Sequence, residues 1–200
     1  MTFDDALPLP DSCAVAFKEW AGVCEALERG MQAIILRKGG IAEGPRGFVP
    51  EHPLFWLYPT RVHQAEQGLR VPELARTGRP AGVPAEEVEL CALARVERVG
   101  RIERPEQLAA LAEFHVWTAA TVAKRFHYRQ PGIWVLGVRV YHRPGPWRVA
   151  VTPEHAGCKT WVPLDPPLPT DGLRPVLPAE EFEARMTRLQ SLLDPHDVPG

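Results

Sequence analysis

The sequence predicts a single α+β domain, organised as a curved mixed sheet or a partly closed barrel of about five or six strands with helices packed around it. The 200 residues suffice for one core, and the apolar (45%) and charged (24%) shares are those of ordinary globular proteins. Segments with helical spacing and segments rich in β-branched residues both occur. We expect one domain over 1–200, with a core over about 12–193, a mobile loop over about 69–85 and frayed ends at 1–10 and 194–200.

The first elements are a helix and two strands. Residues 11–29, "DSCAVAFKEWAGVCEALER", space their apolar side chains on one helical face, with Asp11 or Ser12 available as a cap and Gly30 as a stop. Residues 31–37 are apolar and rich in isoleucine before a double glycine, which predicts a strand that ends in a turn. The run "LFWLYP" predicts a second buried strand, since the prolines at its ends need no ladder donor.

The middle of the chain predicts one strand and two helices. Residues 86–99 alternate apolar and polar side chains, as a half-exposed strand does. Pro105 opens a helix that runs to Phe114, and a further helix begins at Thr118 and ends near Phe126.

The last third combines strands with one long helix. Residues 132–141, "GIWVLGVRVY", are nearly all apolar and predict a central strand, and 144–146, "PGP", predict a turn from which "WRVAV" returns as a hairpin. The segment "GCKTWVPL" predicts a short strand, and "DPPLP" predicts an extended connector. Residues 178–193 place glutamates in the first turn and apolar side chains on one face, which predicts a helix.

Several functional classes find no support in the sequence. The formal charge of −2 does not indicate broad contact with phosphate backbones. The chain has no long apolar run and an acidic N-terminus, so we expect a cytoplasmic protein without membrane partners. The sequence lacks the glycine-rich and nucleophile-elbow motifs, so we predict no cofactor and lean against an enzyme.

The four cysteines, Cys13, Cys24, Cys91 and Cys158, are far apart and form no C-x-x-C pair. This spacing does not indicate a zinc ribbon or a redox motif, and we predict no metal site. A metal site assembled in space from separated cysteines and histidines stays open.

Polar groups concentrate where two predicted strands end, which predicts a small pocket for an anionic or polar planar ligand. The ends of neighbouring strands bring distant side chains together, a Gly-Gly turn can present backbone N–H groups to an anion, and arginine is a planar bidentate donor. The candidate ligand-binding residues are Arg37, Lys38, Gly39, Gly40, Tyr58, Thr60, His63, Gln64 and the more distant Lys159. The predicted partner is RNA, a nucleotide or a modified base.

Two other functions remain open. The first is a hydrolase or nuclease in which Glu51, His52 and His63 activate water, with or without a metal ion. The second is a protein-interaction domain without a small-ligand pocket. Trp20, Trp56, Trp117 and Trp134 lie on predicted apolar faces, so a base-stacking role falls to Trp147 and Trp161.

The pattern "KEWAGVCEALERGMQAIILRKGGIAEG", "EHPLFWLYPTRVHQ", "GCKTWVPLD" and "PVLPAEEF" resembles an uncharacterised bacterial and plant family, the domain of unknown function 1802, over about residues 17–189. That family implies no activity. A looser resemblance, to the ASCH branch of the PUA-like RNA-binding pseudobarrels, implies a barrel fold and RNA binding. Of that branch's signature G-x-K-x-x-E-x-R, Gly30 and Arg37 match, while Gln32 stands for lysine and Ile35 for glutamate.

Overall fold

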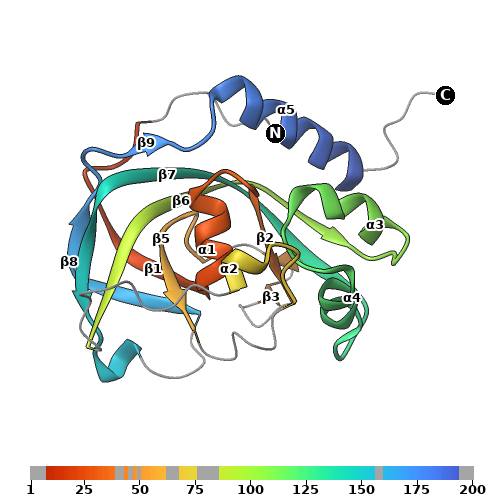
Figure 1. Cartoon of the computed structure of the whole chain (residues 1–200), viewed down its shortest axis with the longest axis horizontal. Coiled ribbons are helices and arrows are strands. Elements are labelled where there is room, and N and C mark those ends of the chain that lie inside the picture. The colour runs from red at the N-terminus through yellow and green to blue at the C-terminus, as the bar shows by residue number, and fades with distance from the viewer. Residues whose placement is uncertain are drawn as a thin grey trace.

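The computed structural model describes residues 8–38, 43–44, 47–48, 51–61, 68–75, 86–155 and 160–193. Within them, a seven-stranded mixed sheet and a set of helices form one α+β domain, as the sequence predicts (Figure 1). The strands of this sheet are β1 (Ser12–Trp20), β2 (Ile34–Arg37), β5 (Leu54–Thr60), β6 (Glu87–Ile102), β7 (Ile133–Ala150), β8 (Trp161–Pro169) and β9 (Arg174–Pro175). A separate two-stranded ladder pairs β3 (Glu43–Gly44) with β4 (Gly47–Phe48).

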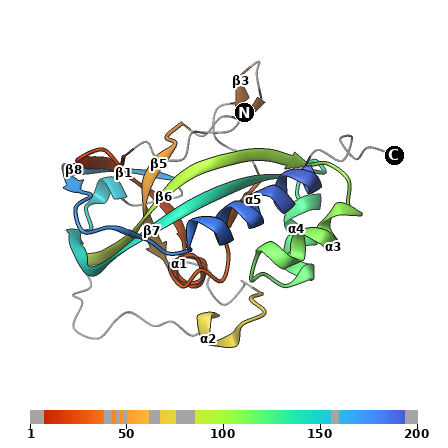
Figure 2. The ribbon, with the colours of Figure 1, turned by 90° about the horizontal axis from the view of Figure 1, so that it is seen from above.

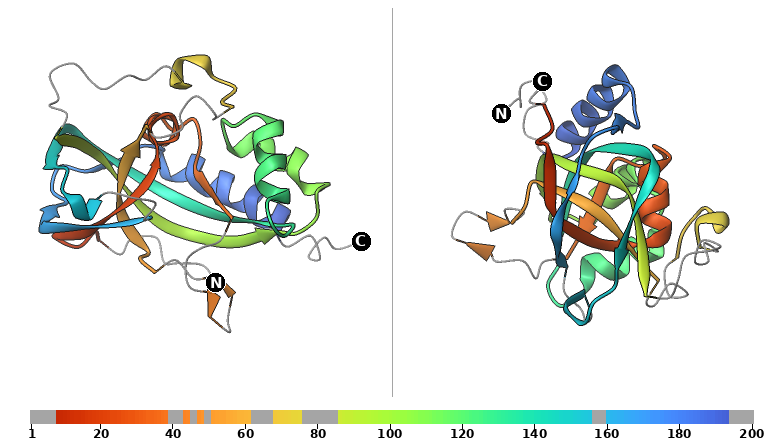
Figure 3. Two further views of the ribbon diagram at one scale, coloured as in Figure 1. Left: turned by 90° about the horizontal axis from the view of Figure 1, so that it is seen from below. Right: turned by 90° about the vertical axis from the view of Figure 1, so that its left-hand side faces the viewer.

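The strand order is β2-β7-β6-β5-β1-β8, with β9 paired to β7. Neighbours are antiparallel except β1 and β5, which are parallel. The sheet is strongly curved, and its two outermost strands, β2 and β8, do not pair with each other. Figure 3 shows how the curved strands surround an interior that is open along one side.

The helices are α1 (Ala21–Glu28), α2 (Pro72–Ala75), α3 (Gln107–Leu111), α4 (Ala119–His127) and α5 (Ala179–Leu193). Short 3-10 turns cover Ala112–Phe114 and Pro153–His155. Helix α1 lies on the concave side of the sheet, and α5 lies along β6 and β7 on the other side (Figure 2). A Cβ at Gly137 would lie 2.7 Å from Met186 Sδ, so this glycine allows α5 to approach β7 closely.

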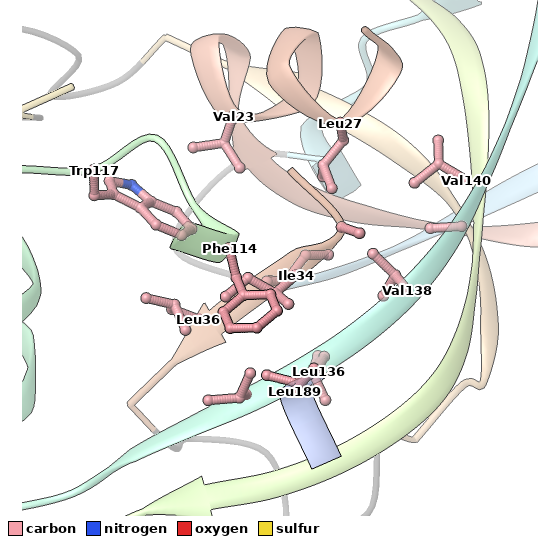
Figure 4. Close-up of a cluster of buried hydrophobic side chains, with 14 of the residues drawn as sticks. Val23, Leu27, Ile34, Leu36, Phe114, Trp117, Leu136, Val138, Val140 and Leu189 are labelled. Carbon is pink, nitrogen blue, oxygen red and sulfur yellow. The ribbon is translucent and has the colours of Figure 1, made fainter. Parts of the chain in front are cut away.

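The core lies mainly between α1, the sheet and the α3–α4 region. Val23 and Leu27 of α1 face Ile34 and Val138 across it (Figure 4). Trp56 and Trp117 are fully buried, as predicted from their apolar faces. A second apolar cluster lies on the other face of β1 and β5, around Trp56 and Tyr58. The helices in the described parts of the chain include none long and apolar enough to cross a membrane.

The predicted helix over 11–29 is wrong in its first half, where residues 12–20 form β1. Strand β1 lies between β5 and β8 and is covered by apolar residues on both faces. A strand buried on both faces carries apolar residues at nearly every position, and such a run also satisfies helical spacing. Only α1, over Ala21–Glu28, is helical.

The predicted Pro144-Gly145-Pro146 hairpin is also wrong, because β7 continues through these residues to Ala150. Leu90 is opposite Trp147 and Ala92 is opposite His142, so the segment 143–146 bulges from the ladder instead of reversing the chain. The predicted connector "DPPLP" is part of β8, an edge strand where prolines need no partner for a missing N–H.

The predicted loop over 69–85 is described as far as Ala75, and up to there it is folded against the core. Leu74 of α2 is buried against Ala26 and Val116, and Leu69 forms a β-bridge with Trp117. The other predicted strands and helices occur as expected, with β6 and β7 longer than predicted.

Candidate functional site

A pocket of about 330 Å³ opens where β1, β2 and β5 end beside α4. Because β1 and β5 are parallel and in register at Trp20 and Thr60, both strands deliver their last residues to the same edge of the sheet. The residues lining the pocket are Lys18, Glu19, Trp20, Leu36, Arg37, Lys38, Thr60 and Arg125. The structure therefore brings together Arg37, Lys38 and Thr60 of the predicted set.

Arg37 lies at the centre of this pocket. Its Nη2 donates a 2.8 Å hydrogen bond to Thr160 Oγ1, and its Nη1 lies 3.8 Å from Glu19 Oε2. Its guanidinium carbon lies 4.4 Å from the centroid of the Phe17 ring. Burial lowers the pKa of Arg37, and the Glu19 carboxylate partly offsets this. Since Arg37 ends β2 and Thr160 precedes β8, this hydrogen bond joins the two unpaired edges of the sheet.

Glu19 is a buried carboxylate with one oxygen unused within the described parts of the chain. It is 4% exposed, and its Oε1 accepts a 2.8 Å hydrogen bond from the Trp20 backbone N–H. Its Oε2 has no hydrogen-bond partner among the described residues, although the Arg37 guanidinium is close. Buried carboxylate oxygens are normally hydrogen-bonded, so Oε2 is available to a donor from a ligand or water.

Arg125 of α4 supplies a second cation to the pocket. Its guanidinium carbon lies 4.0 Å from the Trp20 ring centroid and 4.9 Å from that of Trp117, so the two indoles hold the side chain in place. Burial lowers the pKa of Arg125; the Glu19 charge raises it, and the Arg37 charge lowers it further. Two guanidinium groups thus share one carboxylate.

Lys38 lines the pocket, but its ammonium group is directed at backbone carbonyls. It donates to the oxygens of Phe126 (2.7 Å) and Gly132 (2.8 Å), and also to that of Gln130. Its three N–H bonds hold the segment that follows α4, where free carbonyls accept cationic donors. Lys38 accordingly builds the pocket wall, and Arg125 provides the second cation in the place expected for Lys38.

Tyr58 does not line the pocket. Its side chain lies on the opposite face of β5, because successive side chains of a strand point to opposite sides. There its ring contacts His155, at 5.9 Å between centroids, and lies below the Lys18 ammonium. Tyr58 thus belongs to the second apolar cluster.

Five other predicted ligand-binding residues lie outside the described residues: Gly39, Gly40, His63, Gln64 and Lys159. Of the alternative hydrolytic set, His63 lies there as well. His52 Nε2 and Glu51 Oε1 are 3.9 Å apart, both side chains are exposed, and neither lines the pocket. The His52 ring rests against Trp161, with 5.0 Å between ring centroids.

Sequence reasoning missed Glu19, Trp20 and Arg125. The first two were placed in a helix, and the only signal for them was a Lys-Glu pair inside an apolar segment. Arg125 lies in a correctly predicted helix, but nothing in the sequence connects it with Arg37. Of the signature positions that depart, Gln32 bonds the Ile34 carbonyl (2.8 Å) and the Val116 N–H (3.1 Å), and Ile35 is buried in the core.

Comparison with known proteins gives one family and a set of similar structures. A family model described as "Domain of unknown function (DUF1802)" matches residues 16–188. Comparison with curated proteins gives no match.

The similar structures are of the ASCH protein from Zymomonas mobilis. The unmodified protein is 14% identical with a TM-score of 0.41, over 89% of this chain and 94% of that one. Two point mutants of it give 12% and 0.44, over 90% and 98%, and 11% and 0.43, over 86% and 96%. Similarity at this level does not extend to function.

Proposed function

The chain belongs to the DUF1802 family, and we propose that it is a binding module that holds one nucleotide, free or within single-stranded RNA, in the pocket between β1, β2, β5 and α4. The observation that carries this proposal is the convergence of Arg37 and Arg125 on a pocket that contains one buried carboxylate, Glu19.

The charge balance of the pocket favours an anionic group. Both guanidinium groups are held in place, Arg37 by Thr160 and Phe17, and Arg125 between two indoles. Arginine offers a planar fork of donors that suits phosphate, and a held side chain loses little further entropy on binding. Burial and mutual repulsion lower the pKa of Arg125, and a bound phosphate would relieve that repulsion.

Glu19 favours a ligand that also carries a hydrogen-bond donor. Its free Oε2 can accept from an amino or imino group of a base, as carboxylates do with cytosine. Thr60 adds a hydroxyl that can donate or accept. The pocket volume, about 330 Å³, lies at the lower end of the range for small-molecule sites and suits a single base with its phosphate.

The net charge of −2 argues for a local contact and against a long nucleic-acid track. We therefore expect a shallow dependence of affinity on salt, with a slope near −0.7 in log K against log salt for one phosphate of a single strand.

Isothermal titration calorimetry tests the proposal, with nucleoside 5′-monophosphates, the matching nucleosides and a short single-stranded RNA as ligands. We expect the monophosphates and the RNA to bind, and the nucleosides to bind at least tenfold more weakly. Arg125→Gln should abolish binding, Glu19→Gln should change the preference among bases, and the exposed Arg104→Gln should behave as wild type. Circular dichroism checks that each variant is folded.

The outcome separates the candidate functions. Tighter binding of RNA than of monophosphates would identify RNA as the physiological source of the nucleotide. A folded protein that binds none of these ligands, or binds them equally well in Arg125→Gln, would overturn the proposal and favour the protein-interaction alternative.

A further inference from the structure

Three side chains with metal-binding atoms meet at the far end of α1 from the pocket. They are Glu28, the last residue of α1; Cys91 of β6; and His142 of β7. One ligand atom from each lies within 4.8 Å of the other two, and all three side chains are half-buried. We propose that Glu28, Cys91 and His142 bind a divalent transition-metal ion of the zinc type.

The bulge in the long β6–β7 ladder builds this cluster. The register between the two strands breaks at Cys91, between the pairs Leu90–Trp147 and Ala92–His142. The β7 residues 143–146, which include Pro144 and Pro146, leave the ladder opposite Cys91. Bulges redirect side chains and are frequent beside functional sites. Here the irregularity places a cysteine next to a histidine from the neighbouring strand.

Helix α1 supplies the third ligand. It runs across the concave side of the sheet and ends at Glu28, and Gly30 then turns the chain away with a φ of 66°. Because a helix of eight residues is about 12 Å long, the two ends of α1 serve separate sites. The carboxylate reaches Cys91 closely enough to accept a hydrogen bond from its thiol.

The donor set selects the class of metal. A thiolate sulfur, an imidazole nitrogen and a carboxylate oxygen are the common ligands of Zn²⁺, whereas Mg²⁺ and Ca²⁺ require several oxygen ligands. Three protein ligands leave one tetrahedral position for water or a further group. The half-buried position of the cluster lets an ion enter from solvent.

The charges around the cluster also favour a cation. Burial raises the pKa of Glu28, and burial together with the Glu28 carboxylate raises that of Cys91. Among the described residues, Glu28 forms no ion pair with a lysine or arginine, so this carboxylate lacks a cation from the protein itself. A bound divalent ion would supply that charge and deprotonate the thiol, as metal coordination does generally.

Cobalt(II) titration tests the proposal, because a Co²⁺–thiolate bond produces a charge-transfer absorption band. With protein dialysed against EDTA, we expect one equivalent of Co²⁺ to produce that band and Zn²⁺ to remove it. Cys91→Ser should abolish the band, and His142→Ala and Glu28→Gln should weaken binding at least tenfold. Cys13→Ser and His127→Ala are matched controls that should keep wild-type behaviour.

The contrary results are equally definite. A folded wild type without a stoichiometric band, or a band of equal strength in Cys91→Ser, would overturn the proposal. If Cys91→Ser fails to fold, Glu28→Gln decides, because it keeps the thiol and the imidazole; unchanged Co²⁺ affinity in that variant would also overturn the site. Zn²⁺ should raise the Tm of wild type and leave that of Cys91→Ser unchanged.

Discussion

The two ends of α1 are surrounded by ionisable groups of opposite character. At its beginning, Arg37 and Arg125 share the single carboxylate of Glu19. At its end, Glu28 and the Cys91 thiol lie together beside the neutral-or-cationic His142. The pKa values of the arginines are lowered at one end, and those of the acids are raised at the other.

This contrast shows what kind of ligand each end requires. In both places burial penalises the charged form, but at the pocket the protein already supplies an opposite charge, Glu19, and a surplus of cations remains. At the cluster, the described residues supply no cation to Glu28. An anion would complete the first environment and a metal cation the second. The predictions that follow test this difference, from the largest expected effect to the smallest.

Replacing Arg37 should have the largest effect on stability. Arg37→Met leaves the buried Glu19 without its nearest cation and breaks the hydrogen bond to Thr160, so we expect a loss of about 3–5 kcal/mol in the free energy of unfolding. Urea denaturation measures this loss. The exposed Arg29→Met is the matched control and should cost less than about 0.5 kcal/mol.

The Arg37→Met/Glu19→Gln double variant sharpens the test. If the loss arises from the uncompensated carboxylate, the double variant should be more stable than Arg37→Met alone. Equal stability of these two variants would contradict the assigned role of the Glu19 charge.

A buried histidine near the pocket should make stability depend on pH. His115 is 2% exposed, and burial followed by repulsion from Arg70 lowers its pKa to about 4. The unfolded chain takes up a proton near pH 6.5 and the folded chain does not, so wild type should lose stability as pH falls from 6.5 to about 4. The loss over this window should be about 3 kcal/mol.

Urea denaturation across this pH range checks the prediction. His115→Leu should flatten the profile between pH 6.5 and 4, whereas the exposed His127→Leu should keep the wild-type slope. The same slope in His115→Leu as in wild type would show that other groups cause the acid sensitivity.

Lys38 should separate stability from binding. Its ammonium group bonds the carbonyls of Phe126, Gln130 and Gly132, so Lys38→Met should cost about 1–2 kcal/mol of stability. Nucleotide affinity should stay within threefold of wild type, because Arg37 and Arg125 keep their positions. Calorimetry on Lys38→Met and the exposed Lys124→Met distinguishes the roles, and complete loss of binding in Lys38→Met would restore Lys38 as an anion ligand.

Glu28→Gln should have the smallest effect on stability, and the sign of that effect should depend on metal. Because folding raises the pKa of Glu28, metal-free wild type should lose stability as pH rises above the ordinary value of 4.5, while Glu28→Gln should not. In EDTA at neutral pH we therefore expect the variant to match or exceed wild type, by up to about 1 kcal/mol. Zn²⁺ should reverse the order. Thermal denaturation with and without Zn²⁺ measures both, and an order independent of Zn²⁺ would count against the cluster as a metal site.

The sequence predicts the fold class and most elements because their signals are local. The strands β2, β5 and β6 and the helices α3, α4 and α5 follow from periodicity, prolines and caps. The failures have tertiary causes. Strand β1 is covered on both faces and so resembles a helix in its spacing, and the Pro144-Gly145-Pro146 bulge becomes recognisable only when β6 lies opposite.

The pocket could be predicted in part for the same reason. Arg37 and Thr60 follow from the rule that polar residues at neighbouring strand ends converge. Tyr58 and Lys38 could not be placed, because their roles depend on the face of β5 and on carbonyls far along the chain. Glu19 and Arg125 reach the pocket through long-range packing that no local pattern encodes.

The Arg37–Thr160 hydrogen bond gives the pocket a mechanical role. It links the first and last strands of the sheet path, β2 and β8, along the one seam that no backbone ladder closes. A phosphate that takes Nη2 from Thr160 would unfasten this seam. Ligand occupancy would then be felt as faster amide exchange along β8, at the opposite edge of the sheet from the strand that carries Arg37.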